Sequence, residues 1–503
     1  MKYLKILLLT LVVFGCNSEK ESKRETFSED KTFEVLTSII DNYVDQTLDR
    51  GNVNSFALAI YKDGKMYQNY YGEIDNVAHN KPNDSSLFEI ASITKTFTGS
   101  LIAKAVLNGK ITLEDDIRTY FEGDYSNLEY QGHPITIKNL LTHSLGFKYK
   151  TPERLEIFNK KMNSGESVDK IDIYTIQNLL EELKTVEIDK KPGTVFEYTS
   201  IGPELLAYIL EKVNQQSFDE QVIAFFNEIG MHNTYLNESE KYLNNLVRGY
   251  KGSELSPIDY CPIYGAAGGA ISTLPDMAIY MQYLIEHKNK PWIKEASRTL
   301  FVDEEDGEQI GYLWQNIGFA EEEGYFYSKT GTSHGTQSGI LICPDSNYGI
   351  VLMVNNTSDK ALNDWGTLLF YDVEPDLIKY PKLNLSSSLK SEFKNNPEKA
   401  MAEFRKRKTD TAAYYLNTRS VNNLGYQLLK ENQYQSAIEV FKFITEEFPK
   451  DANAYDSLGE AYFTVKDYGK ALLNYRKSLE LNPENDNAKS YIIKIEELSK
   501  QQS

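Results

Sequence analysis

Residues 87–97 read Leu87-Phe-Glu-Ile-Ala-Ser-Ile-Thr-Lys-Thr-Phe97 and contain a Ser-x-x-Lys tetrad, Ser92 to Lys95. Apolar residues recur as far as Asn108-Gly109, and this pattern predicts a helix that Ser92 opens. A spacing of three places Ser92 and Lys95 on the same helical face. Burial of that face would disfavour the ammonium form of Lys95, so its amine could take the serine proton. Context singles out this tetrad, because the same pattern also begins at Ser28, Ser167, Ser387 and Ser391.

A second element, Glu197-Tyr198-Thr199-Ser200, precedes an amphipathic helix that is expected from about residue 203 to 213. A tyrosine held near a cationic lysine has a lowered phenol pKa. Tyr198 could therefore act as the base in acylation and as the acid toward the leaving group. Taken alone, Tyr198 is equally compatible with a packed aromatic, since the chain holds 35 tyrosines.

A third element, Ser328-Lys329-Thr330-Gly331-Thr332, lies on a strand-like run that begins at Gly324. The glycine would let another backbone come close, and a strand edge can pair with an extended substrate amide. Lys329 could hold a carboxylate, and the backbone amides of Thr332 and Ser92 could form an oxyanion hole. The alternative is an ordinary edge strand on which the lysine prevents pairing with another chain.

Strand-like runs occur both early and late in the region from residue 33 to 376. Residues 56–61 and 66–71 flank a turn, and further runs cover 324–328, 339–342 and 349–354. Early and late strands separated by a long helical middle predict one antiparallel sheet closed by both ends of the domain. The expected fold class is therefore α/β in the α+β sense, an antiparallel sheet flanked by helices with a helical subdomain beside it.

The order of the three elements, spread over about 240 residues, resembles the serine β-lactamase and penicillin-binding superfamily. It looks closest to the class C branch, which includes D-alanyl carboxypeptidases, D-aminopeptidases and simple esterases. Residues 111–116, 135–146 and 266–273 also resemble that branch. The resemblance implies that Ser92 is the acylated nucleophile, Lys95 its activator and Tyr198 the general base. It also implies a substrate-binding set comprising Lys329, Thr330, Gly331 and Thr332.

One position departs from this resemblance, because the branch usually has Asn where this chain has Ser200. A hydroxyl is shorter and presents no amide to the substrate carbonyl. Esterase-like activity therefore stays open beside β-lactamase or peptidase activity. His334, just past the Lys-Thr-Gly motif, either lines the cleft or is a loop residue, and His143 is expected to have a packing role.

An internal repeat follows a largely polar stretch, residues 377–410, that is expected to be a linker. Leu424-Gly425 recurs as Leu458-Gly459 after 34 residues, which is the tetratricopeptide period. Tyr434, Ala437 and Pro449 recur with the same offset as Tyr468, Ala471 and Pro483. Residues 411–503 are therefore predicted to form an all-α repeat domain with flanking helices at 411–417 and 487–498. Such a stack either binds a protein partner or packs on the neighbouring domain.

The N-terminus combines Lys2 and Lys5 with an apolar run, residues 6–14, that is too short to span a bilayer. Residues 1–16 are therefore expected to be a signal peptide. It ends in Val13-Phe14-Gly15-Cys16, which resembles the bacterial lipoprotein cleavage box with Cys16 as the lipid-bearing residue. A plain secretory signal with an incidental cysteine is the alternative. With lipid on Cys16 and residues 17–32 as a tether, the protein would be anchored to a membrane of the bacterial cell envelope, facing the periplasm or the surface.

The formal net charge of -19 argues against a nucleic-acid partner, because a phosphate backbone would be repelled. Cys261 and Cys343 either pair or are simply buried, and no metal-ligand spacing is found, so neither a metal nor a cofactor is expected. The leading hypothesis is a serine hydrolase acting through an acyl-enzyme on small esters, amides or D-amino-acid peptides. The alternative is a catalytically weak sensor or scaffold that binds cell-wall fragments and recruits a protein through its repeats.

Overall fold

A computed structural model describes residues 29–501, except for residues 76–79, 150, 164–173, 259–262 and 306. The predicted signal peptide, Cys16, most of the predicted tether, and Cys261 lie outside the described residues. Within the ranges described, no helix is both long enough and apolar enough to cross a membrane. Cys343 is a buried free thiol.

A six-stranded antiparallel sheet forms the centre of the N-terminal part, with the strand order β12-β13-β14-β15-β1-β2. The early strands join the late ones directly, because Phe56 of β1 pairs with Val354 of β15 and Lys62 pairs with Tyr348. The predicted closure of one sheet by both ends of the domain is therefore confirmed. The strands are β1 Ser55–Lys62, β2 Lys65–Gly72, β12 Gln315–Ala320, β13 Gly324–Thr332, β14 Gln337–Cys343 and β15 Tyr348–Val354.

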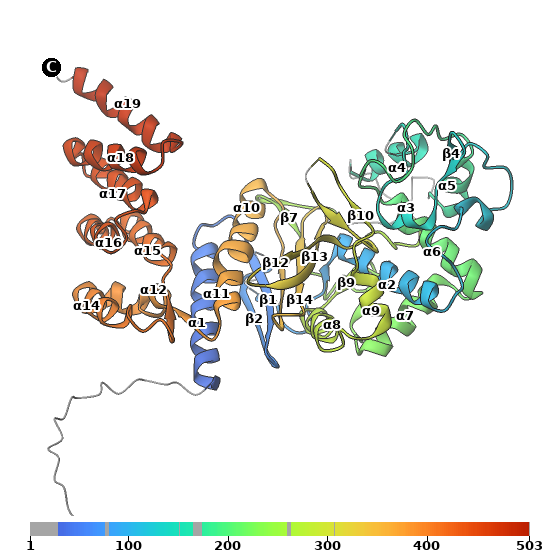
Figure 1. Ribbon diagram of the computed structural model, residues 1–503, viewed down its shortest axis with the longest axis horizontal. Coiled ribbons are helices and arrows are strands. Elements are labelled where there is room, and N and C mark those ends of the chain that lie inside the picture. Colours follow the sequence, from blue (N-terminus) through green and yellow to red (C-terminus); the bar gives the residue numbers. More distant parts are fainter. Residues whose placement is uncertain are drawn as a thin grey trace, which may run out of the picture.

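Helices cover both faces of this sheet (Figure 1). Side chains alternate along a strand, so Phe56, Leu58 and Ile60 of β1 enter one core, whereas Ala57 and Ala59 enter the other. The first core is closed by α1 Glu29–Leu48, α10 Asp359–Thr367 and α11 Glu374–Lys379. The second core is closed by α8 Leu274–Glu286 and α2 Thr94–Leu107.

A helical region continues the second core away from the sheet, as predicted (Figure 1). Its helices, with α9 beside α2, are α3 Ile137–Leu141, α4 Glu153–Asn163, α5 Ile176–Leu183, α6 Ile201–Asn214, α7 Phe218–Ile229 and α9 Pro291–Ser297. A small sheet, ordered β3-β9-β6, comprises β3 Phe88–Glu89, β6 Thr234–Leu236 and β9 Ala270–Ser272. Two-residue strands pair as β4 Glu129–Tyr130 with β5 His133–Pro134, β7 Tyr250–Lys251 with β8 Glu254–Leu255, and β10 Phe301–Val302 with β11 Gln309–Ile310.

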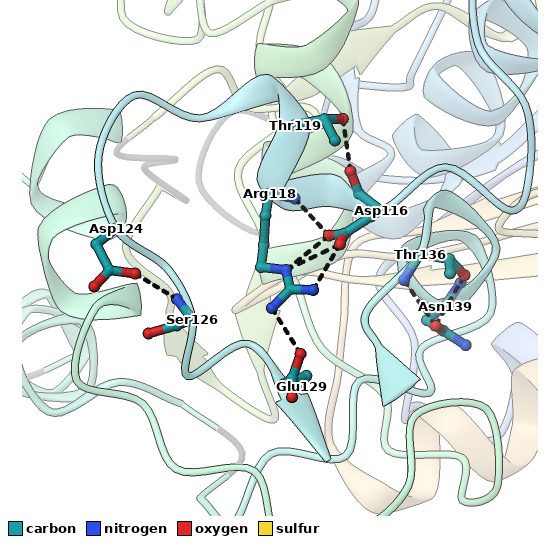
Figure 2. A network of polar contacts seen from close by, with 8 residues as sticks. All are labelled: Asp116, Arg118, Thr119, Asp124, Ser126, Glu129, Thr136 and Asn139. Carbon is teal, nitrogen blue, oxygen red and sulfur yellow. Dashed lines mark hydrogen bonds and ion pairs between the residues drawn. The ribbon is translucent and has the colours of Figure 1, made fainter. Parts of the chain in front are cut away.

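Polar contacts order the loops of the helical region (Figure 2). The Arg118 guanidinium lies between two carboxylates, 2.7 Å from Asp116 Oδ2 and 2.9 Å from Glu129 Oε2. Thr136 and Asn139 cap α3 reciprocally, since the side chain of each accepts a hydrogen bond from the backbone amide of the other. This reciprocal capping fixes the point at which α3 begins.

The C-terminal part is a stack of antiparallel helix pairs, and the predicted tetratricopeptide organisation is confirmed. Gly425 and Gly459 explain the close approach within each pair. A Cβ at Gly425 would lie 2.4 Å from the Phe441 ring, and one at Gly459 would lie 3.0 Å from the Tyr475 ring. The helices are α15 Arg419–Lys430, α16 Tyr434–Glu447, α17 Ala452–Thr464, α18 Tyr468–Leu481 and α19 Asp486–Gln501.

Two expectations for the preceding segment were wrong. Residues 377–410 do not form the predicted linker, because they contain α12 Leu385–Ser388, α13 Lys390–Asn395 and α14 Pro397–Arg407. Leu385, Phe393 and Phe404 enter the core of the repeats, so the polar composition concealed a few regularly spaced apolar residues. Residues 411–417 are not a helix either, since β17 Tyr414–Tyr415 pairs with β16 Leu383–Asn384.

Candidate active site

Ser92 lies in a short turn, Ala91–Ile93, that leads directly into α2. Ala91, immediately before it, has a φ of 46°, in the left-handed region that non-glycine residues rarely adopt. Such a conformation costs on the order of 1–3 kcal/mol and is found at sites where the surroundings hold it in place. Here the Thr94 hydroxyl donates to the Ala91 carbonyl at 2.6 Å. The serine is thus presented at the tip of a constrained turn.

Lys95 is held beside Ser92 by two contacts. Its Nζ donates to Ser92 Oγ at 3.0 Å and to the carbonyl oxygen of Ala267 at 2.5 Å. The side chain is only 1% exposed. The amine therefore has a fixed position next to the serine rather than a solvated one.

Tyr198 joins these residues from the segment that precedes α6. Its ring lies 5.0 Å from Lys95 Nζ and 4.7 Å from Lys329 Nζ, and its hydroxyl accepts a hydrogen bond from Lys329 Nζ at 3.3 Å. Burial raises the pKa of Tyr198, but the charges of Lys95 and Lys329 and hydrogen bonds from Ser92 and Lys95 bring it down to about 8. The phenol can therefore exchange a proton near neutral pH.

Lys329 reaches the site from the middle of β13 and is 1% exposed. Burial lowers the pKa of Lys329 to about 8, with Lys95 acting in the same direction and Tyr198 opposing it. Its Nζ also donates to Gln315 on β12, and the Gln315 amide in turn donates to Glu308 at 3.2 Å. Three segments remote in sequence thus place Ser92, Lys95, Tyr198 and Lys329 together.

Gly331 allows β13 to reach the serine turn. A Cβ at this position would lie 2.2 Å from the Ile90 carbonyl oxygen and 2.8 Å from the Ser92 amide nitrogen. Only glycine permits this approach without a shift of one backbone or the other. The end of β13, including Thr332, therefore lies beside the backbone of Ser92.

Two profile comparisons agree with this arrangement. A profile of the β-lactamase family matches residues 40–370, and a tetratricopeptide-repeat profile matches residues 452–485. The chain belongs to the β-lactamase family. The predicted family and fold are thereby confirmed.

Individual relatives of this β-lactamase-family protein are distant. Protein flp of Staphylococcus aureus (strain MRSA252) is 22% identical over 364 residues, which cover 71% of this chain and 69% of that protein. The D-alanyl-D-alanine-carboxypeptidase/endopeptidase AmpH of Escherichia coli (strain K12) is 23% identical over 343 residues, covering 64% and 85%. The structure of a class C β-lactamase has a TM-score of 0.56 at 20% identity and covers 69% of this chain and 98% of that chain. The structural likeness shows the shared fold.

The remaining predicted residues of the β-lactamase-family domain lie around this centre. Ser200 is exposed directly before α6, and Thr330 and Thr332 follow Lys329 on β13, where the Thr332 hydroxyl donates to Gln337. The His334 carbonyl accepts hydrogen bonds from Ser256 at 3.1 Å and Thr357 at 2.8 Å. His334 therefore has a role in anchoring the loop after β13.

His143 contributes more than the packing expected of it. It is fully buried, its ring lies 4.5 Å from the Tyr198 ring, and its Nδ1 accepts a hydrogen bond from the Thr199 amide at 3.3 Å. Its carbonyl oxygen also accepts from the Glu197 amide at 2.7 Å. His143 therefore orients the segment that carries Tyr198. Residues 135–146 were recognised as a family-like stretch, but nothing local in them points to Tyr198.

The sequence predicted no individual role for Ala267, although it lies in the family-like stretch 266–273, and none for Gln315. Ala267 acts through its carbonyl oxygen, which any residue possesses, so its type carries no signal. Gln315 lies on a strand that was not predicted. Among the described residues, no group of three or more His, Cys, Asp or Glu side chains is placed to hold a metal ion.

Proposed function

We propose that this protein is a serine hydrolase that forms an acyl-enzyme on Ser92 and acts on small esters, amides or D-amino-acid peptides. The observation that carries the proposal is the contact of Ser92 with the buried amine of Lys95, next to the phenol of Tyr198. A serine becomes a nucleophile when adjacent groups can remove its proton, and this cluster provides such groups. The similarity to a D-alanyl-D-alanine-carboxypeptidase/endopeptidase favours D-amino-acid peptides among these substrates.

In the proposed reaction, the Tyr198 phenolate takes the hydroxyl proton of Ser92 while Oγ bonds to the substrate carbonyl carbon. The carbonyl electron pair moves to its oxygen, and the backbone amides of Ser92 and Thr332 stabilise the oxyanion. When that pair returns, the bond to the leaving group breaks, and the leaving group takes the proton from Tyr198. Water, which gives its proton to the same phenolate, then attacks the Ser92 ester. The ester bond to Ser92 then breaks, Oγ takes the proton from Tyr198, and release of the carboxylic acid restores both the Ser92 hydroxyl and the phenolate.

The test is replacement of Ser92 by alanine, with a fluorophosphonate or a fluorescent penicillin as label and p-nitrophenyl acetate as substrate. We expect labelling to disappear and turnover to fall by about 10³-fold or more. Ser391→Ala is the matched control, because Ser391 begins another Ser-x-x-Lys tetrad but is exposed on α13. Unchanged labelling of the Ser92→Ala protein would contradict the proposal.

We also propose that Cys16 carries a lipid that anchors the protein to a membrane of the bacterial cell envelope. The support is the sequence Val13-Phe14-Gly15-Cys16 after a short apolar run. Metabolic labelling with palmitate should mark the wild-type protein and not a Cys16→Ser variant. Equal labelling of both proteins, or none of either, would contradict the anchor.

A further inference from the structure

Glu204, on the first turns of α6, is a buried carboxylate that the proposed chemistry does not use. Its Oε2 accepts a hydrogen bond from the Tyr264 amide at 2.9 Å, and its Oε1 accepts one from the Ala267 amide at 3.0 Å. Burial raises the pKa of Glu204 to about 7, against the opposing effects of the Ala267 and Tyr264 amides and of Lys95. A buried carboxylate is costly unless it is well bonded, so its position beside the site calls for an explanation.

Ala267 connects this carboxylate to the catalytic cluster. Its amide donates to Glu204, and its carbonyl oxygen accepts from Lys95 Nζ at 2.5 Å. The loop of residues 263–269, which contains Ala267, also contacts α2, because the Thr98 hydroxyl donates to the Ala266 carbonyl at 3.0 Å. Lys95 Nζ is therefore held both by Ser92 and by the Ala267 carbonyl.

We propose that Glu204 is a positioning residue, which anchors Ala267 so that the Ala267 carbonyl holds Lys95 Nζ between Ser92 and Tyr198. This inference rests on the proposed acyl-enzyme function. It adds a requirement, namely that the charge of Lys95 reaches Tyr198 only while the Ala267 amide is bonded to Glu204.

A carboxylate suits this role better than its amide. Two backbone N–H groups converge on the two oxygens of Glu204, and each oxygen accepts one of them. In Glu204→Gln, the side chain keeps one acceptor oxygen but turns an NH₂ group toward the other backbone N–H. That contact between two donors should push the loop away while side-chain size is conserved.

The experiment compares Glu204→Gln with Tyr264→Phe. The control removes the hydrogen bond from the Tyr264 hydroxyl to Glu211 at 2.8 Å, which also ties this loop to α6, but retains the backbone amide that Glu204 binds. We expect kcat for p-nitrophenyl acetate to fall about 10²-fold in Glu204→Gln with little change in KM, because a small displacement of Lys95 misaligns the reacting groups. Tyr264→Phe should keep kcat near the wild-type value.

The pH profile separates positioning from general stabilisation. Lys95 from α2, Lys329 from β13 and His143 face the Tyr198 ring. If Lys95 moves away, Tyr198 loses one of the two charges that lower its pKa, so the acid limb of kcat/KM should move to higher pH in Glu204→Gln. A loss of folded protein would scale the profile without moving its limb, and that result, or wild-type kcat, overturns the inference.

Three further outcomes are decisive. If Glu204→Gln does not fold, Glu204→Asp replaces it, because this variant keeps the charge and both oxygens but is one carbon shorter. A wild-type kcat and acid limb in Glu204→Asp then overturn the inference, and a lowered kcat with a raised acid limb supports it.

If the wild-type enzyme shows no acylation that depends on Ser92, the proposed function fails and the inference with it. If the wild type is acylated normally and Glu204→Gln equals it, only the inference fails.

Discussion

Lys95 and Lys329 both lie beside the Tyr198 ring and lower the pKa of its phenol. This arrangement determines how activity is expected to depend on pH. As a base, Tyr198 must be deprotonated, so activity should rise as the pH increases through its pKa of about 8. Lys329, whose pKa is also about 8, loses its charge as the pH increases through that value. We therefore expect a bell-shaped profile of kcat/KM with its optimum near pH 8, whose two limbs belong to the coupled groups rather than to either residue.

Replacing Lys329 by methionine tests this assignment. Methionine fills similar space without charge, so Tyr198 should become harder to deprotonate. We expect the acid limb of kcat/KM to move to higher pH and kcat/KM at pH 7 to fall by about 10²-fold. An acid limb that stays in place, or moves to lower pH, would show that Lys329 does not act on the phenol.

Ser200 is predicted to influence substrate choice. It stands where the class C branch usually has an asparagine, and it is exposed at the start of α6, so a larger side chain meets no obstacle there. In Ser200→Asn, an amide becomes available to a substrate carbonyl. We expect the ratio of kcat/KM for a D-alanyl peptide or nitrocefin to that for p-nitrophenyl acetate to increase about tenfold. An unchanged ratio would exclude this position as a cause of specificity.

The strand β13 is the element on which the site depends most directly, because it delivers both Lys329 and the end that contacts the serine turn. In Gly331→Ala, the new Cβ would meet the Ile90 carbonyl oxygen at 2.2 Å. Either β13 or the turn must then retreat, which should cost about 1–3 kcal/mol of stability and reduce acylation by fluorophosphonate about 10²-fold.

A second glycine provides the control for that variant. Gly366 on α10 has open space around the position of a Cβ, so Gly366→Ala should leave acylation unchanged and stability equal or slightly higher. If both variants behave alike, the approach of β13 to Ser92 is not what matters.

The repeats and the hydrolase domain form a continuous structure around α1 (Figure 1). The Tyr43 hydroxyl on α1 hydrogen bonds Ser387 at 2.7 Å and Ser420 at 3.3 Å, and Lys430 Nζ donates to the Asp49 carbonyl at 2.8 Å. The contacts of Tyr43 are buried, whereas the Lys430 contact is exposed, and a buried polar network holds its parts in one arrangement. The repeats are therefore docked on the side of the sheet opposite the helical region.

A chain ending at Lys382 tests this docking. It loses the partners of Tyr43 and uncovers part of α1, so the melting temperature of the hydrolase domain should fall by about 5 °C or more. The reactivity of Ser92 should persist below that temperature, since α2 and β13 are untouched. A chain that lacks only α19 is the control, because α19 packs within the repeats. A truncation at Lys382 with the wild-type melting temperature would refute a stabilising interface.

Much of the architecture was predictable because it depends on near neighbours in the chain. The apolar run of residues 56–61, the turn after it and the 34-residue recurrence are local patterns, and each yielded the element expected. For residues 377–410, in contrast, the prediction of a linker rested on their polar composition and was wrong. There, three short helices are stabilised by a few apolar side chains that contact the repeats. The sequence contains no long periodic apolar pattern that would predict these helices.

The candidate site divides in the same way. Ser92, Lys95, Tyr198 and Lys329 could be named in advance because recognisable motifs carry them. The contacts of Lys95 with Ala267, of Glu204 with that loop, and of His143 with the Tyr198 segment could not. They join residues far apart in the chain, several through backbone atoms that every residue type possesses. Motifs specify which side chains can react, whereas folding of separate segments against one another sets the distances and charges that govern whether they do.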